Sequence, residues 1–282
     1  MDNRLKTVVL LGALTGLLLF AGGALGGRGG LLIALVFAVL INFASYWFSD
    51  KVILWMYGAR EIKEHENPRL HGIVREVARL AGVPMPRVCI IPSNSPNAFA
   101  TGRSPGHAAV AVTGGILSLL DDNELKGVIA HELSHVKNRD TLVATIAATI
   151  AGVISYLAMM ARWAAIFGGY GGRDRDGKNM VELLALAILT PLIAMLIQLA
   201  ISRSREYMAD ESAVRTLHTA DGLITALQKI DRGIASQPAL HATKAAASLF
   251  IANPLRGNAL FALFSTHPQM EKRINRLKEL RL

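Results

Sequence analysis

The sequence predicts a mainly α-helical integral membrane protein, with four apolar helices and an α+β domain that contains a small β-sheet. Two observations carry this prediction. Of the 282 residues, 52% are hydrophobic and 18% are charged, with a mean hydropathy of +0.37, which is too apolar for an ordinary soluble domain. The apolar residues also gather in four runs, each close to the roughly 20 residues that cross the hydrocarbon of a bilayer.

Charge and cysteine content narrow the class of protein. The net charge of +9 does not indicate a nucleic-acid-binding protein, because the basic residues are scattered beside the apolar segments, without a platform of aromatic and basic residues. The positive-inside bias of a membrane protein explains this charge better. The single cysteine, Cys89, excludes an intrachain disulfide framework and is expected to be a buried strand residue.

Residues 1–50 are expected to form an N-terminal transmembrane hairpin. Its two apolar runs cover residues 7–27 and 31–49, and the glycine-rich residues 26–30 form the predicted turn. Aromatic residues typical of a membrane interface lie in and after the second run: Tyr46, Trp47, Trp55 and Tyr57. A cleaved signal peptide is the alternative interpretation, since small residues end the first run, but the second run follows at once.

Residues 51–140 are expected to form the first half of the globular domain. A helix is predicted over residues 67–80, with Asn67 as its cap, Pro68 in its first turn and Gly82 at its end. Three short strands are expected to follow: residues 88–91, 97–101 and 108–113. A second helix then closes this half of the domain.

That second helix is amphipathic and carries two histidines four residues apart. Asp121, three residues before Glu124, is suited to cap it. Positions four apart share one face of a helix, so His131 and His135 can point their imidazoles at one metal ion. Glu132 flanks the same site, where a carboxylate can take a proton from the attacking water and hand it to a leaving amine. This is the zinc metalloprotease pattern, which needs one further protein ligand; two surface histidines are the alternative.

Residues 141–201 are expected to form a second apolar hairpin that spans the membrane or inserts into it. Its runs cover residues 141–161 and 183–201, and a buried hairpin of core helices is the alternative. Two crossings return the chain to the side it left, so residues 202–282 can complete a site begun by His135. Helices are expected in this last segment from Arg203, from near Asp221 and across residues 268–280, the last capped by Ser265 and Thr266.

The third metal ligand is expected to be a His, Asp, Glu or Cys on one of these later helices. Glu206 is the best candidate, and Asp210 lies on the same face one turn later. Metal-bound histidines usually donate their second N–H to a carboxylate, and Asp210 is placed to accept it from one of the two. The alternative is that Glu206 and Asp210 form a solvated helix face, paired with Arg203 or Arg205.

The chain resembles the HtpX membrane metalloproteases, which are relatives of the CAAX prenyl endoproteases in the gluzincin group. The motifs that carry the resemblance are YGARE at residues 57–61, NAFATG at 97–102, HELSHVKNRD at 131–140, SREYMAD at 204–210, and STHP at 265–268 with Arg273. The resemblance implies a cytoplasmic α+β gluzincin metallopeptidase domain that binds one Zn²⁺ through His131, His135 and Glu206. It also implies that Glu132 is the general base and that Asp210 supports a ligand.

Further assignments follow from the same resemblance. The segment beside the cleft corresponds to Asn97, Ala98, Phe99, Ala100 and Thr101. An exposed strand edge there can pair with an extended peptide substrate, and an ordinary hairpin is the alternative. His267 is similar to a histidine that stabilises the tetrahedral oxyanion, and a histidine without a role is the alternative. For Arg273, on the following helix, a purely structural role is the alternative.

The sequence therefore predicts a membrane-bound zinc endopeptidase that acts on polypeptides, in particular membrane proteins. By resemblance, it lies in the inner membrane and degrades damaged proteins under stress. Charges around Glu132 disfavour an intramembrane protease, and a non-catalytic metal-binding scaffold would not need that carboxylate. A metal transporter or sensor is disfavoured, because a transporter should have ionisable residues within its membrane spans. Here only Glu182, at the edge of an apolar run, comes near to this. With about six residues between His135 and the next run, the metal is expected roughly 10 Å from the bilayer.

The distribution of basic residues predicts the orientation. Lysines and arginines are concentrated in the segments next to the globular domain, which places the metal site and both termini in the cytoplasm. The opposite connections carry only Arg28, Arg162, Arg173, Arg175 and Lys178. All of these except Arg28 lie in the connection of the second hairpin, where basic residues conflict with a position outside the cytoplasm. A shallow second hairpin that does not span the membrane would remove this conflict and is the alternative.

Overall fold

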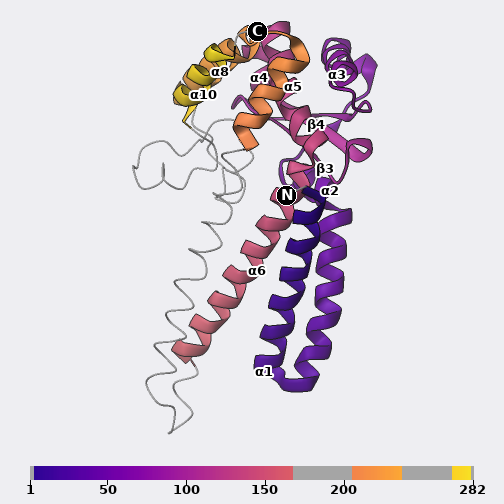
Figure 1. Cartoon of the computed structure of the whole chain (residues 1–282), viewed down its shortest axis with the longest axis vertical. Helices are drawn as coiled ribbons and strands as arrows, with labels where there is room; N and C mark the ends of the chain where they lie inside the picture. The colour runs from indigo at the N-terminus through magenta and orange to yellow at the C-terminus, as the bar shows by residue number, and fades with distance from the viewer. Residues whose placement is uncertain (1–2, 168–204, 237–268, 281–282) are drawn as a thin grey trace.

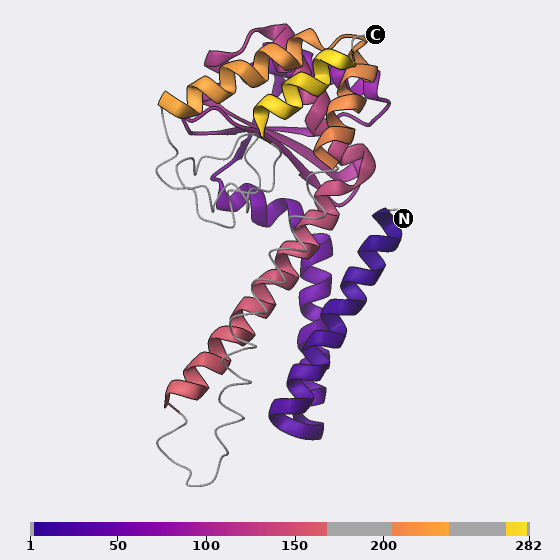
Figure 2. The same cartoon turned by 60° about the vertical axis from the view of Figure 1, so that its left-hand side comes forward.

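The structure, a computed structural model, describes residues 3–167, 205–236 and 269–280. A helical stalk stands below a head in which helices pack on a small sheet (Figure 1). Two helices in the described part of the chain form the stalk, α1 (Asn3–Trp47) and α6 (Asp140–Phe167). They run side by side in Figure 2, and the chain starts where the stalk meets the head.

The helix α1 is a hairpin of two antiparallel arms. Its helical conformation breaks at Gly26 and at Gly27, whose φ is +55°, a value that favours glycine. A Cβ at Gly30 would overlap the backbone oxygen of Gly22 on the other arm. The predicted turn at residues 26–30 is therefore confirmed, and glycine is needed both for the turn and for the close approach of the arms.

The two arms are long and apolar enough to cross a membrane, by length and composition. They cover Asn3–Gly23 and Gly26–Trp47, with mean hydropathies of 1.9 and 2.1. Only 11% of each arm is buried, and large side chains such as Phe20 face outward. The core helix of a soluble protein would be mostly buried, and these arms are not. Of the predicted second hairpin, α6 is described, whereas residues 183–201 lie outside the described residues.

The first elements of the head follow α1 directly. They are α2 (Ser49–Met56), β1 (Arg60–Glu61), the 3₁₀ turn η1 (Glu64–Glu66) and α3 (Pro68–Ala81). The side chain of Asn67 accepts a hydrogen bond from the Leu70 N–H at the start of α3, and Gly82 ends the helix with a φ of +67°. The predicted cap, first-turn proline and terminal glycine of this helix are thus confirmed.

A four-stranded sheet lies at the centre of the head. It consists of β1, β2 (Arg87–Ile91), β3 (Ala98–Gly102) and β4 (Ala108–Thr113), in the order β1-β2-β4-β3. The pair β2–β4 is parallel, and the other two pairs are antiparallel. Alternate residues of each strand face opposite sides: one set packs against α3 and α5, and the other, which includes Cys89, packs against α2. The three predicted strands and the buried position of Cys89 are confirmed.

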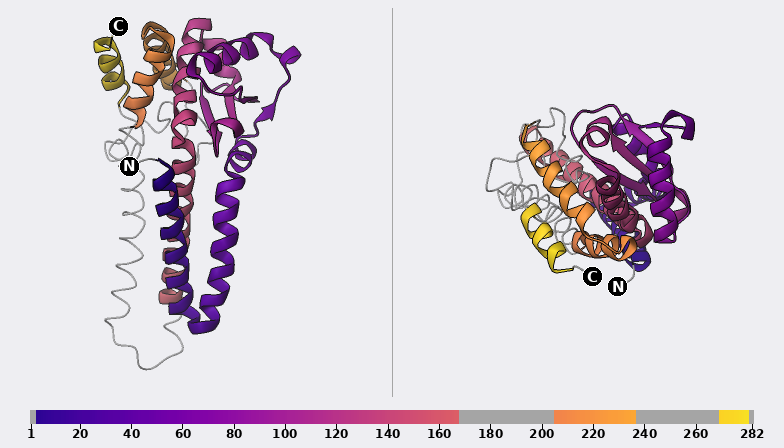
Figure 3. Two further views of the ribbon diagram at one scale, coloured as in Figure 1. Left: turned by 45° about the vertical axis from the view of Figure 1, so that its right-hand side comes forward. Right: turned by 90° about the horizontal axis from the view of Figure 1, so that it is seen from above.

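Further helices complete the head around the sheet, which Figure 3 shows from the side and from above. In the described residues they are α4 (Gly114–Leu119), α5 (Asp122–Asn138), a helix across 205–217, α8 (Asp221–Ser236) and α10 (Met270–Glu279), with a 3₁₀ turn η2 (Pro105–His107) between strands. The last helix begins later than predicted. Gln269 is its N-cap residue and makes no side-chain cap bond, and the cap predicted at Ser265 and Thr266 lies outside the described residues.

The crossing of α5 and α8 yields a testable prediction about packing. A Cβ at Gly222 would overlap the backbone oxygen of Asn123, and one at Gly127 would lie 2.7 Å from the Leu223 nitrogen. We expect Gly222→Ala to lower the thermal unfolding midpoint by several degrees, because the two helices must separate. Circular dichroism of the detergent-solubilised chain measures this shift.

The matched control is Gly72→Ala on the exposed face of α3, where an added Cβ meets nothing within 4 Å. Alanine is a better helix former than glycine by about 1 kcal/mol, so this variant should be unchanged or more stable. Equal midpoints for the two variants would contradict the close crossing.

Candidate metal centre

The helix α5 brings His131, Glu132 and His135 into the interior of the head. Its start is fixed by reciprocal bonds: Asp121 accepts from the Glu124 N–H, and Glu124 accepts from the Asp121 N–H, both at 3.0 Å. Its apolar face is fully buried against the sheet, α3 and α8. The exposed fraction of His131 is only 3%, so two surface histidines are excluded.

The helix across residues 205–217 supplies Glu206 to the same point. The His131 Nε2 atom lies 3.3 Å from the His135 Nε2 atom, and each of these nitrogens lies 3.4 Å from a carboxylate oxygen of Glu206. A tetrahedral ion held at about 2.0–2.1 Å by three such atoms separates them by roughly 3.3–3.4 Å. The spacing and the two-nitrogen, one-carboxylate donor set therefore fit a divalent transition-metal ion. Because Glu206 is buried, a solvated helix face is excluded.

His131 is held by Asp210, one turn after Glu206. The His131 Nδ1 atom lies 2.9 Å from Asp210 Oδ1. Arg273 of α10 donates to both oxygens of this carboxylate, from Nη2 at 2.6 Å and from Nε at 2.9 Å. Burial alone would raise the pKa of Asp210, but the Arg273 guanidinium and His131 outweigh it and hold that pKa below its usual range. The contact predicted between Asp210 and one histidine is thus present.

Arg273 belongs to this centre. The sequence had left open whether this residue has a purely structural role. The side chain is fully buried, and its Nη1 atom also lies 3.5 Å from Glu206 Oε2. Arg273 shares the inner face of α10 with Met270 and Leu277, at helical spacings of three and four residues. An arginine at an apolar position of a helix is the signal that could have identified it.

His135 has a carboxylate partner of its own, Asp140, which was not predicted from the sequence as a residue of the site. The His135 Nδ1 atom lies 3.1 Å from Asp140 Oδ2. Residues five apart on a continuous helix point roughly 140° away from each other, but Arg139 ends α5 with a φ of +58°. This break turns Asp140 back toward His135. Burial lowers the pKa of His135, but bonds to Asp140 and Glu206 outweigh it and raise that pKa to about 10.

Glu132 faces the outer edge of the sheet. Its Oε2 atom accepts a hydrogen bond of 3.0 Å from the Ala100 N–H on β3, and β3 is the edge strand next to β4. The exposed edge predicted across residues 97–101 is wrong, because each of these residues is at most 2% exposed. α5 and α6 cover this edge, and Thr141 Oγ1 donates to the outward-facing carbonyl oxygen of Gly102.

Comparison with known proteins decides the family. Residues 64–281 match Peptidase family M48. The chain belongs to peptidase family M48. Relatives named "Protease HtpX homolog" cover almost all of it: the protein from Syntrophotalea carbinolica is 52% identical over 99% of both chains. That from Aquifex aeolicus is 55% identical over 94% of this chain and 89% of its own.

The fold of this chain is similar to that of a solved structure. The crystal structure of S. mikatae Ste24p matches 98% of this chain and 65% of its own chain, with a TM-score of 0.55 and 19% sequence identity. At that identity the likeness concerns the fold alone. The family and the relatives together confirm the resemblance to HtpX proteases, and the chain is a metalloprotease. His267 lies outside the described residues.

The contact between Asp140 and His135 gives a prediction about metal binding. Asp140→Asn removes the charge that orients and polarises the His135 imidazole, so we expect the affinity for Zn²⁺ to fall about 10- to 100-fold. Competition with a chromophoric chelator measures this affinity. The control is Asp122→Asn in the first turn of α5, whose partner is the exposed Arg69. Native affinity in the Asp140→Asn protein would remove Asp140 from the centre.

Proposed function

We propose that this M48 protease is a membrane-spanning, zinc-dependent endopeptidase that cleaves damaged membrane proteins at the cytoplasmic face. The observation that carries the proposal is the cluster of His131, His135 and Glu206, with Glu132 beside it. The two histidine Nε2 atoms lie 3.3 Å apart and each lies 3.4 Å from one of the two Glu206 carboxylate oxygens, an arrangement that suits one zinc ion. A carboxylate next to that point suits hydrolysis. The role in stress quality control rests on the resemblance to HtpX proteases alone.

Each residue of the centre has a proposed task in peptide hydrolysis. When bound, zinc would polarise the scissile carbonyl and lower the pKa of the attacking water toward about 7. Glu132 would accept the proton of that water and pass it to the leaving amine. Asp210 and Asp140 hold the two imidazoles through their Nδ1 atoms, which leaves both Nε2 atoms directed at the shared point. Arg273 balances the charge of Asp210.

The edge strand β3 is the proposed binding segment for the substrate, through Asn97 to Thr101. The bond between the Ala100 N–H and Glu132 puts the outer edge of this strand next to the proposed base. A peptide that pairs with β3 by β-augmentation would first have to displace the hydrogen bond between Ala100 and Glu132. Its scissile peptide bond would then lie next to Glu132. The proposed oxyanion role of His267 rests on the motif at residues 265–268 alone.

The proposed membrane placement follows from the exposed apolar arms of α1. Soluble surfaces rarely present so many large apolar side chains together, and the arms have the length of a membrane span. Asp140 begins α6 and also contacts His135, so the metal centre lies at the top of the stalk (Figure 1). The proposed cytoplasmic orientation rests on the bias of lysine and arginine. The proposed multi-pass arrangement rests on the four apolar runs, and the inner-membrane location rests on the resemblance to HtpX proteases alone.

The first prediction of this proposal separates chemistry from metal binding. Glu132→Gln should retain bound zinc and lose casein cleavage by at least about 100-fold, because it removes the base and no ligand. Glu206→Ala should lose zinc and activity together. The control, Glu211→Gln, changes a partly exposed carboxylate that pairs with Arg215 and should leave both properties intact. Normal turnover by Glu132→Gln would refute the mechanism, and native zinc affinity in Glu206→Ala would refute the third ligand.

The second prediction concerns orientation. In a chain with Cys89 replaced, single cysteines are placed at Gly29, at the tip of α1, and at Asn123, in the first turn of α5; both positions are exposed. An impermeant maleimide added to intact cells should label position 29 and spare position 123. The opposite pattern would refute a cytoplasmic metal site. A third cysteine at Gly172 tests the second hairpin: if position 29 is labelled and position 172 is not, that hairpin is shallow.

A further inference from the structure

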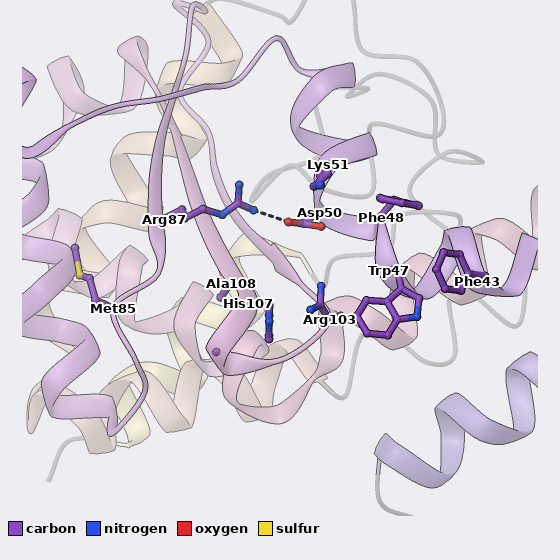
Figure 4. A pocket seen from close by; sticks show the side chains of 11 residues that line it. Phe43, Trp47, Phe48, Asp50, Lys51, Met85, Arg87, Arg103, His107 and Ala108 are labelled. Atoms are coloured by element: carbon purple, nitrogen blue, oxygen red, sulfur yellow. Dashed lines mark hydrogen bonds and ion pairs between the residues drawn. The ribbon is translucent and has the colours of Figure 1, made fainter.

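A pocket of about 470 Å³ lies where the stalk meets the head, and it shares no residue with the metal centre. The end of α1, the start of α2, and the turn between β3 and β4 enclose it (Figure 4). Its apolar wall comes from Phe43, Trp47 and Phe48. Its polar wall includes Lys51, Arg87 and Arg103. Aromatic and cationic side chains therefore meet at one opening.

The level of this pocket along the stalk corresponds to a membrane–water interface. The second arm of α1 has 22 residues and ends at Trp47. At 1.5 Å per residue it spans about 33 Å, close to the roughly 30 Å of bilayer hydrocarbon. Trp47 and Phe43 are 45% and 53% exposed, and aromatic rings gather at headgroup level in membrane proteins. A ligand of the pocket would thus lie among the lipid headgroups.

Two cations of the pocket lack an acidic partner. The Arg103 guanidinium lies 4.5 Å from the centre of the Trp47 ring, and the Lys51 Nζ atom lies 5.4 Å from that of Phe48. Within residues 3–167, 205–236 and 269–280, neither cation forms an ion pair with a carboxylate. Arg87, by contrast, is paired with Asp50 and with Glu61. Cations that rest on aromatic rings keep N–H groups free for an anionic acceptor.

An apolar stripe leads from this pocket down the stalk. Val36, Leu40, Phe43 and Trp47 recur at spacings of four, three and four, so they lie on one face of the second arm. All four are exposed, by between 45% and 58%. This stripe suits a hydrocarbon chain that continues from a headgroup bound in the pocket, and a soluble anion would make no use of it.

We propose that the pocket binds the phosphate headgroup of an anionic phospholipid, with Arg103 and Lys51 on the phosphate and an acyl chain along the stripe of α1. This inference rests on the proposal that α1 spans the membrane, and it does not depend on peptidase activity. Two uncompensated positive charges at the opening favour an anionic headgroup over a zwitterionic one. A volume of about 470 Å³ is within the range of small-molecule sites.

The test counts lipids bound to the full chain in a neutral detergent by native mass spectrometry. Phosphatidylglycerol or phosphatidylcholine is titrated into the wild type and into the double variant Lys51→Gln/Arg103→Gln. We expect the wild type to prefer phosphatidylglycerol by roughly 10- to 30-fold and the double variant to lose this preference, because each basic residue contributes about a fivefold gain. Equal binding of both lipids by the wild type would overturn the proposal, as would an unchanged preference in the double variant.

Three controls keep the result specific. Arg79→Gln/Lys278→Gln removes the same two charge types from exposed positions on α3 and α10, distant from the stalk in Figure 1, and should keep the preference. Arg103→Lys keeps the positive charge and should retain most of the binding that the double variant loses. This comparison distinguishes a lost contact with the lipid from a misfolded chain. Inorganic phosphate at millimolar concentration should not displace phosphatidylglycerol, and displacement would identify a soluble anion as the ligand instead. Labelling at positions 29 and 123 reports separately on whether α1 spans.

Discussion

The buried ion pair between Arg273 and Asp210 is the interaction on which the metal centre depends. It joins residues 63 positions apart, and both side chains are almost fully buried. Removal of one partner from such a pair leaves an uncompensated charge in the interior, which costs roughly 3–5 kcal/mol. Through Asp210 the pair also fixes His131 on α5. The helix across 205–217, α5 and α10 are therefore tied together at the point where Glu206 meets both histidines.

The junction between α5 and α6 connects this centre to the stalk. Arg139 adopts the left-handed conformation that ends one helix and lets the next begin at Asp140. Asp140 then bonds His135 on one side and accepts a hydrogen bond of 2.7 Å from the Asn3 side chain at the start of α1. One carboxylate thus touches both a residue of the metal centre and the first turn of the stalk. Such a link holds the centre at a fixed height above the apolar arms.

The covered edge of β3 sets a condition for substrate access. In the described structure Glu132 accepts the Ala100 N–H, and the Gly102 carbonyl oxygen accepts from Thr141. A peptide that pairs with this edge must replace such bonds, so binding and exposure of the base are coupled. The pocket at the foot of the head is separate from this edge and lies at the level of Trp47, where a lipid can bind without obstructing the proposed cleft.

The local features follow from the amino-acid sequence alone, because each depends on residues close together in the chain. The caps at Asn67 and Asp121, the glycine turn of α1 and the pairing of His131 with His135 on one face follow from side-chain hydrogen bonds, allowed φ values and helical periodicity. Glu206 and Asp210 could be predicted as candidates, because two apolar segments return the chain to the same side.

Which of these candidates meet, and what covers them, depends on the packing of elements that are far apart in the chain. Arg273 reaches Asp210 through the packing of α10, and Asp140 reaches His135 through a helix break that a continuous pattern of helical residues does not reveal. The edge of β3 is buried because α5 and α6 lie against it. Strand periodicity specifies which side chains share a face of the sheet. Whether a strand edge is exposed depends on helices from other parts of the chain that pack against it.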